Sequence, residues 1–227
     1  MFKFVLFDLD DTILDFHKAE AQAIRKTFSQ LGIEPSDENV NKYSAINESL
    51  WKRLERAEIT REQLLSMRFE QLFEELGVNA SIQTARTTYE TLLGQGHFFM
   101  PGAEEILVKL AKDYQLYLVS NGTTKIQEGR IASAGIAQYF KEIFISQNIG
   151  INKPDKGFFD ACFAEIPNFD PEYAIIVGDS LSSDIQGGIN AGIHTCWYNP
   201  KKKDLENGCR PEWMIEDLQE LSGILKL

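Results

Sequence analysis

Short hydrophobic runs alternate with longer segments of helical periodicity in the second half of the chain. The runs are LYLVS (116–120), EIFIS (142–146), AIIVG (174–178) and HTCWY (194–198), and FKFVLF at residues 2–7 has the same character. Runs of this length, rich in β-branched and aromatic residues, predict strands, and their alternation with helices predicts parallel βαβ units. We therefore expect an α/β fold, with a Rossmann-like parallel sheet and helices on both of its faces.

Three segments between these runs predict the helices that connect the strands. They are TTKIQEGRIASAG (123–135), KGFFDACFAEI (156–166) and SSDIQGGINAG (182–192). Gly135 and Gly192 are expected to end the first and the third helix, because glycine adopts the left-handed conformation that often terminates helices. The glycines of GGINAG do not follow a strand directly, so we interpret them as positions of close helix–sheet packing rather than as a dinucleotide-binding loop.

Residues 17–93 follow a different pattern, since their apolar positions recur every three or four residues and no strand is evident. Three breaks divide this segment into four predicted helices, and each break contains a helix-capping residue: Ser36, Thr60 or Ser81. Glycines and a proline after residue 93 mark the return to the strand-and-helix pattern. The predicted boundaries are 1–15 and 97–227 for an α/β catalytic domain, and 16–96 for an all-α domain inserted after the first strand.

Composition and charge narrow the range of partners. The 227 residues carry a formal net charge of -11, which disfavours nucleic-acid polymers because binding to them depends on Lys and Arg. No apolar segment approaches the roughly 20 residues of a membrane helix, and the N-terminus lacks the apolar core of a signal peptide. We expect a cytoplasmic monomer or homodimer. Cys162, Cys196 and Cys209 form no CxxC pair, which argues against a disulfide framework and a zinc cluster.

Acidic side chains stand directly after two of the predicted strands. Asp8 and Asp10 follow the first run, and alternation along an extended chain points both to the same side. Asp179 follows AIIVG, and Asp184 comes five residues later, near the start of a helix. Because the carboxyl ends of parallel strands meet at one edge of a sheet, we expect these carboxylates to share one crevice. Such a cluster stays ionised only beside a cation, and Mg²⁺, which prefers oxygen ligands, is the expected cofactor.

Neutral and basic groups at other strand ends complete the predicted site. Ser120 ends LYLVS, and Asn121 and Gly122 form a turn whose backbone N–H groups can face an anion. Lys153 precedes a proline, and its ammonium group can bind phosphate oxygens as a point charge. An acidic metal-binding crevice surrounded by phosphate-binding groups predicts phosphoryl transfer from a small-molecule phosphate ester.

Taken in order, DLDDT, SNG, NKPD and GDSLSSD resemble the four motifs of the haloacid dehalogenase superfamily, most of whose members are Mg-dependent phosphohydrolases. The resemblance covers the whole chain, because the capped branch of that family carries a helical (C1-type) cap between its first and second motifs, where residues 17–93 lie. The haloacid dehalogenases themselves attack carbon and lack the second aspartate of the first motif. Asp10 therefore favours phosphate chemistry.

The resemblance implies a role for each acidic residue. Asp8 would be the nucleophile that forms an aspartyl-phosphate, and Asp10 would act first as general acid and then as general base. Magnesium would be held by the carboxylate of Asp8, the backbone carbonyl of Asp10 and Asp179, with Asp184 in support. Lys153, together with the metal, would stabilise charge on the transferring group.

The resemblance also implies the substrate contacts. Thr12 would orient Asp10, and Ser120, Asn121 and Gly122 would bind the phosphate group. These residues belong to the first two motifs, so the contacts they predict are to the phosphate and not to the group that leaves.

The stretch VGDSLSSDIQGGINAGIHTCWYNP and the length of the helical segment are most similar to the branch that contains pyrimidine 5′-nucleotidases, which implies a nucleoside 5′-monophosphate as substrate. The same stretch is similar to N-acylneuraminate-9-phosphatases and other sugar-phosphate phosphatases, which are the alternative. A β-phosphoglucomutase-like phosphotransfer would use the same core, although DDT in place of a DGV-type continuation argues against it. A phosphoaccepting regulatory module is the non-enzymatic alternative.

Several polar residues near the motifs have structural interpretations. Alternation turns Asp11 away from Asp8, so Asp11 and Asp15 are expected to support or cap the backbone. Ser182 and Ser183 are expected to cap the helix that follows GDS.

The helical segment offers fewer chemical signals. His17 is a candidate substrate contact, because it lies just after the first motif. Tyr43, Trp51 and Tyr89 fall on the apolar stripes of the predicted helices, where aromatic side chains are more often core than platforms for a nucleobase.

Overall fold

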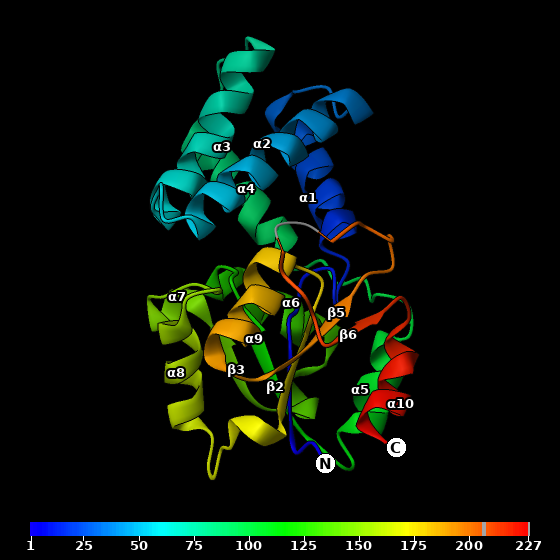
Figure 1. The fold of residues 1–227 in the computed structure, drawn as a ribbon. Coiled ribbons are helices and arrows are strands. Elements are labelled where there is room, and N and C mark those ends of the chain that lie inside the picture. Colours follow the sequence, from blue (N-terminus) through cyan, green and yellow to red (C-terminus); the bar gives the residue numbers. More distant parts are fainter. Residues whose placement is uncertain (206–207, 227) are drawn as a thin grey trace.

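The computed structural model describes the chain except residues 206–207 and 227, and its centre is a parallel sheet of six strands (Figure 1). The strand order is β3-β2-β1-β4-β5-β6. The strands are β1 (Phe4–Phe7), β2 (Gln115–Ser120), β3 (Phe140–Ile145), β4 (Ala174–Gly178), β5 (His194–Tyr198) and β6 (Trp213–Ile215). In the register, Phe7 pairs with Leu118 of β2 and Val177 of β4, so the polar residues that follow these strands reach the same edge of the sheet.

The sequence predicted five of these strands and missed β6. The missed strand has only three residues and lies at the edge of the sheet, beside β5. A run of three residues is too short to show a periodicity, so the pairing of Cys196 with Trp213 was not visible in the sequence.

Helices cover both faces of the sheet, which confirms the predicted α/β class. On one face, strand side chains such as Val5 and Leu118 pack against α5 (Ala103–Leu110), α6 (Thr124–Ala134) and α10 (Leu221–Leu225). On the other face, α8 (Lys156–Glu165) packs in a second cluster around Leu6 and Val119. The helix α9 (Gln186–Ala191) lies on this second face, and the short α7 (Ser146–Ile149) follows β3.

Close packing explains the glycines of α9. A Cβ atom at Gly188 would lie 2.6 Å from a methyl group of Ile176 and 2.7 Å from one of Thr195, so only glycine fits against the sheet there. Gly135 and Gly192 end their helices with φ of 69° and 73°, the left-handed conformation that the sequence predicted.

Four helices form a second group with a core of its own, which we call the helical part. They are α1 (Phe16–Leu31), α2 (Asp37–Glu55), α3 (Arg61–Leu76) and α4 (Ile82–Leu93). The predicted caps are confirmed, since the side chains of Ser36, Thr60 and Ser81 each accept a backbone N–H at the start of α2, α3 and α4. The largest side chains of this core are aromatic and include Tyr43, Phe69 and Tyr89, whose rings contact one another.

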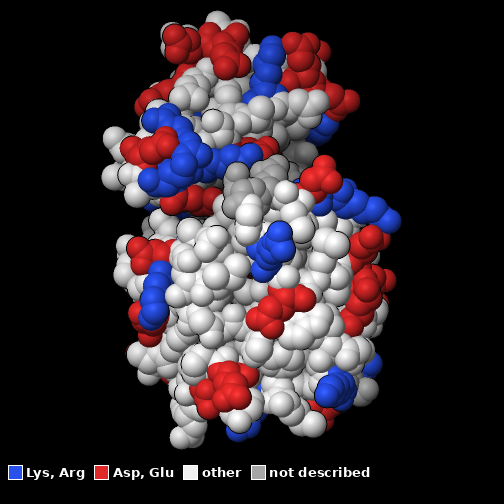
Figure 2. Space-filling view, in the orientation of Figure 1, with Lys and Arg blue, Asp and Glu red and all other residues white. Residues whose placement is uncertain are grey.

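The helical part lies over the edge of the sheet at which β1, β2 and β4 end (Figure 1). The chain enters and leaves it through two adjacent segments, where the backbone N–H of Asp15 donates to the carbonyl of Phe98 at 2.7 Å. On the face shown in Figure 2, charged side chains of both signs are denser on the helical part than on the sheet part below it.

Two further observations concern the whole described chain. Cys162, Cys196 and Cys209 are buried free thiols. Within the described residues, no helix combines the length and the apolar character needed to cross a membrane.

Candidate active site

Asp8 stands at the centre of the site, directly after β1. Its backbone N–H donates to Val177 at 2.9 Å, which continues the sheet pairing by one residue and fixes the side chain at the strand end. The residue is 7% exposed, and its Oδ1 accepts a hydrogen bond of 2.6 Å from Nζ of Lys153. Burial raises the pKa of Asp8 well above its ordinary value, although the charge of Lys153 acts in the opposite direction. Among the described residues, Oδ2 of Asp8 accepts no hydrogen bond and remains available to a ligand.

Lys153 is buried, and its ammonium group is held by three oxygens. Nζ donates to Asp8 Oδ1 at 2.6 Å, to Asp184 Oδ1 at 2.7 Å and to the carbonyl of Val119 at 2.8 Å. Burial alone would lower its pKa, but the two carboxylates raise it, so the amine stays charged. The structure thus places a fixed cation between two of the predicted acids.

Three of the predicted carboxylates could hold a metal ion together. Oxygen atoms of Asp8, Asp179 and Asp184 all lie within 4.8 Å of one another. Burial and the nearby charge of Asp184 raise the pKa of Asp179 to about 7, so a cation bound beside Asp179 would favour its ionised form. An all-oxygen set with excess negative charge fits a hard divalent cation such as Mg²⁺.

Asp10 lies apart from this carboxylate cluster. Its carboxylate pairs with Nη1 of Arg130 and accepts a hydrogen bond of 2.7 Å from Nε2 of Gln127. Arg130 is fully buried, and its Nε also donates to the carbonyl of Gly96 at 3.3 Å. Its guanidinium group lies 5.7 Å from the ring centre of Phe16. The Asp10 carboxylate is therefore oriented by α6 and by both chain segments that join the helical part to the sheet.

Asn121 links the end of β2 to Lys153. Its Oδ1 accepts the backbone N–H of Lys153 at 2.8 Å, and its Nδ2 donates to the carbonyl of the same residue at 2.9 Å. Ser120 is buried, and its Oγ accepts from Gly122 N at 3.1 Å and from Gln127 Nε2 at 2.8 Å. Thr12 is fully buried and does not line the cavity, and among the described residues its Oγ1 has no hydrogen-bond partner, so no hydrogen bond joins it to the Asp10 side chain that it was expected to orient.

A cavity of about 740 Å³ lies between the helical part and the sheet part and contains the catalytic candidates. From the sheet part it is lined by the four predicted aspartates, by Asn121, Gly122 and Lys153. From the helical part it is lined by His17, Glu20, Asn47, Trp51, Arg68 and Tyr89, among others. The cavity is thus built by both parts of the chain, and a ligand on the carboxylates would meet side chains of the helices.

Arg61, at the start of α3, reaches from the helical part to the turn at Asn121 and Gly122. Its Nη1 donates to the carbonyls of Asn121 at 2.8 Å and Gly122 at 2.9 Å. Its Nη2 donates to Ser146 and Asn152, both at 2.7 Å. None of these partners is a carboxylate, and burial lowers the pKa of Arg61 to about 10.

The predicted capping residues near the motifs are partly corrected and partly confirmed. Ser180, and not Ser182 or Ser183, caps the turn after β4, because its Oγ accepts the backbone N–H of Ser183 at 3.2 Å. The earlier residue is better placed because it is the last one with an extended backbone. Asp15 caps α1, and Asp11 accepts the backbone N–H of Phe16 at 2.9 Å, so both have the predicted structural roles.

The aromatic and histidine candidates divide between core and cavity. Tyr43 and Tyr89 are fully buried in the core of the helical part, as predicted, although Tyr89 also borders the cavity. Trp51 is half-buried and lines the cavity, with the Arg61 guanidinium 5.5 Å from its ring centre. His17 also borders the cavity, and the hydrogen bond from its Nε2 to Asp11 raises its pKa.

A match to a family model supplies the decisive comparison, since the model for haloacid dehalogenase-like hydrolase covers residues 5–198. The chain belongs to the haloacid dehalogenase-like hydrolases. This hydrolase is 37% identical to the pyrimidine 5′-nucleotidase PynA of Streptococcus pneumoniae, over 99% of the chain and 95% of PynA. It is 30% identical to the pyrimidine 5′-nucleotidase YjjG of Escherichia coli, over 97% of the chain and 96% of YjjG.

A solved structure supports the same assignment. The magnesium-bound crystal structure of the HAD-hydrolase YfnB from Bacillus subtilis matches the hydrolase with a TM-score of 0.94 and 38% identity, over 100% of this chain and 99% of YfnB. The family and fold that the four sequence motifs implied are thereby confirmed.

Sequence reasoning missed two functional candidates of this hydrolase, Gln127 and Arg130. Both lie on α6, which begins directly after the SNG motif, and a spacing of three residues puts them on one helix face. That spacing was a usable signal, because the helix start next to a strand end is where a polar face meets the site.

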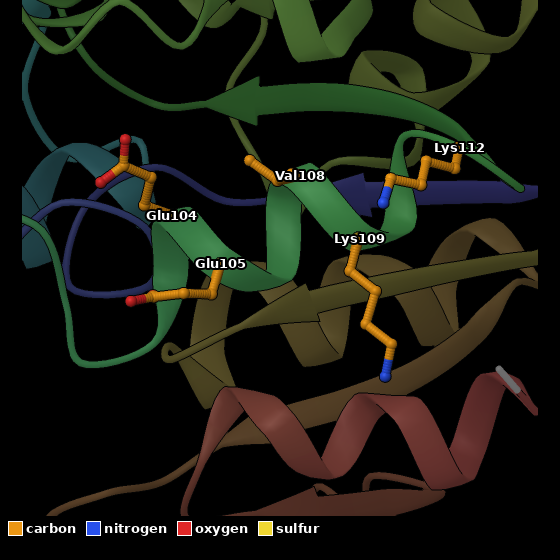
Figure 3. Close-up of a pocket in the computed structure, with 5 residues that line it drawn as sticks. All are labelled: Glu104, Glu105, Val108, Lys109 and Lys112. Atoms are coloured by element: carbon orange, nitrogen blue, oxygen red, sulfur yellow. The ribbon is translucent and has the colours of Figure 1, made fainter.

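A second depression of the hydrolase lies away from this site, along α5 (Figure 3). Four of its lining residues, Glu104, Glu105, Val108 and Lys109, come from that helix, and the fifth, Lys112, lies in the turn just after it. It lacks a converging set of carboxylates or nucleophiles, so the cavity around Asp8 is the candidate active site.

Proposed function

We propose that this hydrolase is a Mg-dependent phosphomonoesterase that acts through an aspartyl-phosphate, with a pyrimidine nucleoside 5′-monophosphate as its substrate. The observation that carries this proposal is the arrangement around Asp8. One oxygen of its carboxylate is fixed by Lys153, the other has no hydrogen-bond partner among the described residues, and the metal-binding candidates Asp179 and Asp184 stand beside it. Lys153 supplies counter-charge on one side of this nucleophile, and a metal ion held by the carboxylates would supply it on the other.

In the first half of the reaction, Oδ2 of Asp8 attacks the phosphorus atom and a new P–O bond forms. The ester P–O bond breaks, and the departing oxygen takes a proton from the carboxyl group of Asp10. Proton transfer of this kind contributes roughly 10²- to 10⁴-fold to the rate when the acid is well positioned. Gln127 and Arg130 would supply the positioning, because both bind the Asp10 side chain.

In the second half, a water molecule attacks the phosphorus of the aspartyl-phosphate and gives its proton to the Asp10 carboxylate. The bond between phosphorus and Asp8 breaks, so inorganic phosphate leaves and the Asp8 carboxylate is restored. The first half leaves Asp10 ionised, as the second half requires, and the second half leaves it protonated again.

Asp8, Asp179, Asp184 and the backbone carbonyl of Asp10 would hold the magnesium ion. When bound, Mg²⁺ offsets the negative charge of the phosphoryl group and of the clustered carboxylates. Lys153 also offsets negative charge at this site, since its ammonium group is fixed 2.6 Å from Oδ1 of Asp8, the attacking residue. Ser120, Asn121 and Gly122 would contribute to phosphate binding, directly or by holding the turn.

The helical part supports a nucleotide as substrate. We propose that residues 16–96 act as a cap domain on the catalytic domain of residues 1–15 and 97–227. A cavity of about 740 Å³ lies in the size range of small-molecule sites and leaves room beyond the phosphate for a nucleoside. The likeness over nearly full length to PynA and YjjG favours a pyrimidine nucleotide over a sugar phosphate.

A panel of phosphate esters tests this proposal. Hydrolysis of UMP, dUMP, dTMP, purine monophosphates and sugar phosphates should be measured with magnesium and after its removal by a chelator. We expect the highest kcat/KM for pyrimidine monophosphates, dependence on the metal, and loss of turnover in Asp8→Asn. A clear preference for a sugar phosphate would overturn the choice of substrate. Turnover by Asp8→Asn at the wild-type rate would overturn the mechanism.

A further inference from the structure

Four buried side-chain atoms of the helical part have no hydrogen-bond partner among the described residues. Two of them are the hydroxyls of Tyr43 and Tyr89, and the other two are Oδ1 of Asn47 in α2 and Nε of Arg68 in α3. Asn47 is 1% exposed and Arg68 is 2% exposed, and both residues line the cavity that contains the catalytic aspartates. Buried polar atoms are nearly always paired, so an unpaired acceptor and an unpaired donor on two residues that line one cavity indicate a ligand that pairs with them.

The orientation of the Asn47 amide is fixed by its neighbours. Its Nδ2 donates to Oε1 of Glu20 at 2.7 Å, and Ser44 donates to the other oxygen of Glu20 at 2.7 Å. A flipped amide would set Oδ1 against the carboxyl oxygen and lose this bond. Asn47 therefore offers the cavity an acceptor and not a donor.

The side chain of Arg68 is held on two sides. Its Nη2 pairs with Glu90 at 3.2 Å, and its guanidinium group lies 4.8 Å from the ring centre of Tyr89. These contacts account for the position of the guanidinium plane but leave Nε open. Neither Arg68 nor Asn47 touches a catalytic residue within the described hydrogen bonds, so the mechanism proposed above does not explain why they are buried here.

We propose that Asn47 and Arg68 form the subsite that recognises the base of the nucleotide, and that this subsite reads the imide edge of uracil or thymine. Oδ1 of Asn47 accepts the N3–H of the base, and Nε of Arg68 donates to a carbonyl next to it. This inference rests on the proposed function, since it assumes that the phosphate of a nucleotide is bound at Asp8.

The subsite discriminates between bases by the hydrogen on N3. Uracil and thymine carry a donor there with a carbonyl acceptor on each side, which matches an acceptor next to a donor. Cytosine has a bare acceptor at N3, which would face Oδ1 of Asn47 without a hydrogen between them. A site built around a hydrogen bond rejects a ligand that leaves its buried group unpaired. UMP should therefore be preferred over CMP.

The first test uses the wild-type protein and needs no variant. kcat/KM is measured for UMP, CMP, N3-methyluridine 5′-monophosphate and ribose 5-phosphate. We expect CMP and the N3-methyl compound to fall at least about tenfold below UMP, because neither can donate from N3. Equal values for UMP and its N3-methyl derivative would overturn the inference, whatever the variants do.

The second test replaces the acceptor. In Asn47→Ala, the ratio of kcat/KM for UMP to that for ribose 5-phosphate should fall at least about tenfold, and the preference for UMP over CMP should shrink. Asn41→Ala, an exposed position on the same helix, should keep the wild-type ratios. An unchanged UMP-to-CMP preference in folded Asn47→Ala would contradict the subsite.

The outcomes separate the two proposals. If no nucleoside monophosphate is hydrolysed faster than ribose 5-phosphate, the proposed substrate is wrong and the subsite falls with it. If pyrimidine monophosphates are preferred but neither N3 methylation nor Asn47→Ala changes the preference, the proposed function stands and only the base-recognition subsite is wrong.

Discussion

At the scale of single residues, the side chain of Asp10 is oriented by two partners on α6. It has charged and neutral hydrogen-bond partners on α6, one of which is the fully buried Arg130. Arg130 in turn contacts Gly96 and Phe16, which lie where the chain passes between the helical part and the sheet part. The position of the proposed proton donor is therefore tied to the junction of the two parts.

Replacing Arg130 should weaken proton transfer more than binding. In Arg130→Gln, we expect kcat/KM for UMP to fall by about 10²-fold, because the leaving ribose oxygen needs a proton. The loss should be much smaller for 4-nitrophenyl phosphate, whose leaving group departs without one. Arg25→Gln is the control, because Arg25 pairs with Asp37 at the surface of the helical part. This variant should leave both rates unchanged. Equal losses for both substrates would show that Arg130 has only a structural role.

Glu20 should make the stability of the protein depend on pH. Burial raises the pKa of Glu20 above its ordinary value of 4.5, so the native state binds this proton more tightly than the unfolded chain does. The resulting cost is absent below about pH 4.5 and grows as pH rises through the native pKa. We expect Glu20→Gln, which can keep both hydrogen bonds, to match the wild type at low pH and to exceed its stability at neutral pH. Urea unfolding at several pH values measures this, and a difference that does not change with pH would contradict it.

At the scale of elements, the site depends on strand ends that approach a neighbour closely. Gly178, the last residue of β4, has the carboxylate of Asp184 where a Cβ atom would be. At Gly122, after β2, a Cβ atom would lie 2.4 Å from the side chain of Gln127. Glycine at these two positions lets the following helices bring their polar side chains against the sheet.

Gly178→Ala should therefore lower the affinity for magnesium. The added methyl group displaces Asp184, and disturbing the groups that support a metal site typically costs about 10- to 100-fold in affinity. Isothermal titration calorimetry with Mg²⁺ gives the affinity directly. Gly223→Ala, where a Cβ would meet nothing within 4 Å, is the control and should bind as the wild type does. Unchanged affinity in Gly178→Ala would remove Asp184 from the metal site.

The sequence was sufficient for elements with strong local signals. The runs that became β4 and β5 were predicted with their observed bounds, because short runs rich in β-branched and aromatic residues mark strands. The caps Ser36, Thr60 and Ser81 were found because a side-chain cap depends on neighbours only a few residues away.

Features that depend on long-range contacts were not visible in the sequence. The pairing of Arg130 with Asp10 joins residues 120 positions apart, and no local pattern reports it. The same applies to Asn47 and Arg68, which look like ordinary polar positions on amphipathic helices until the four helices enclose them. The motif residues of the site could be assigned because they follow strands, whereas the residues of the helical part required the packing.

At the scale of the whole molecule, the side chain of Arg61 joins the helical part to the turn at Asn121 and Gly122. It makes four hydrogen bonds across the junction, to Asn121, Gly122, Ser146 and Asn152. Because these partners are neutral, the contact is held by geometry and not by a charge pair. The position of the helical part is thereby coupled to the turn that would bind phosphate.

Arg61→Ala should raise KM for the phosphate ester by up to about 30-fold, since the turn loses two hydrogen bonds that hold it and each is worth about 1 kcal/mol. Hydrogen exchange should increase at residues 121–122 in the same variant. Arg56→Ala, whose side chain is exposed and pairs with Glu58 within the helical part, is the control. A wild-type KM together with unchanged exchange in Arg61→Ala would show that the two parts are not coupled through this residue.

The central claim is that Asp8 carries the phosphoryl group, and trapping the phosphorylated protein tests it most directly. Asp10→Asn is mixed with 4-nitrophenyl phosphate and magnesium and then quenched in acid. The leaving group needs no proton, so the first half of the reaction proceeds while the second half lacks its base. Mass spectrometry should find one phosphoryl group on the peptide that contains Asp8, and none when Asp8 is also replaced by Asn. Turnover by the wild type without any phosphorylated protein, or a phosphoryl group on another residue, would contradict the account.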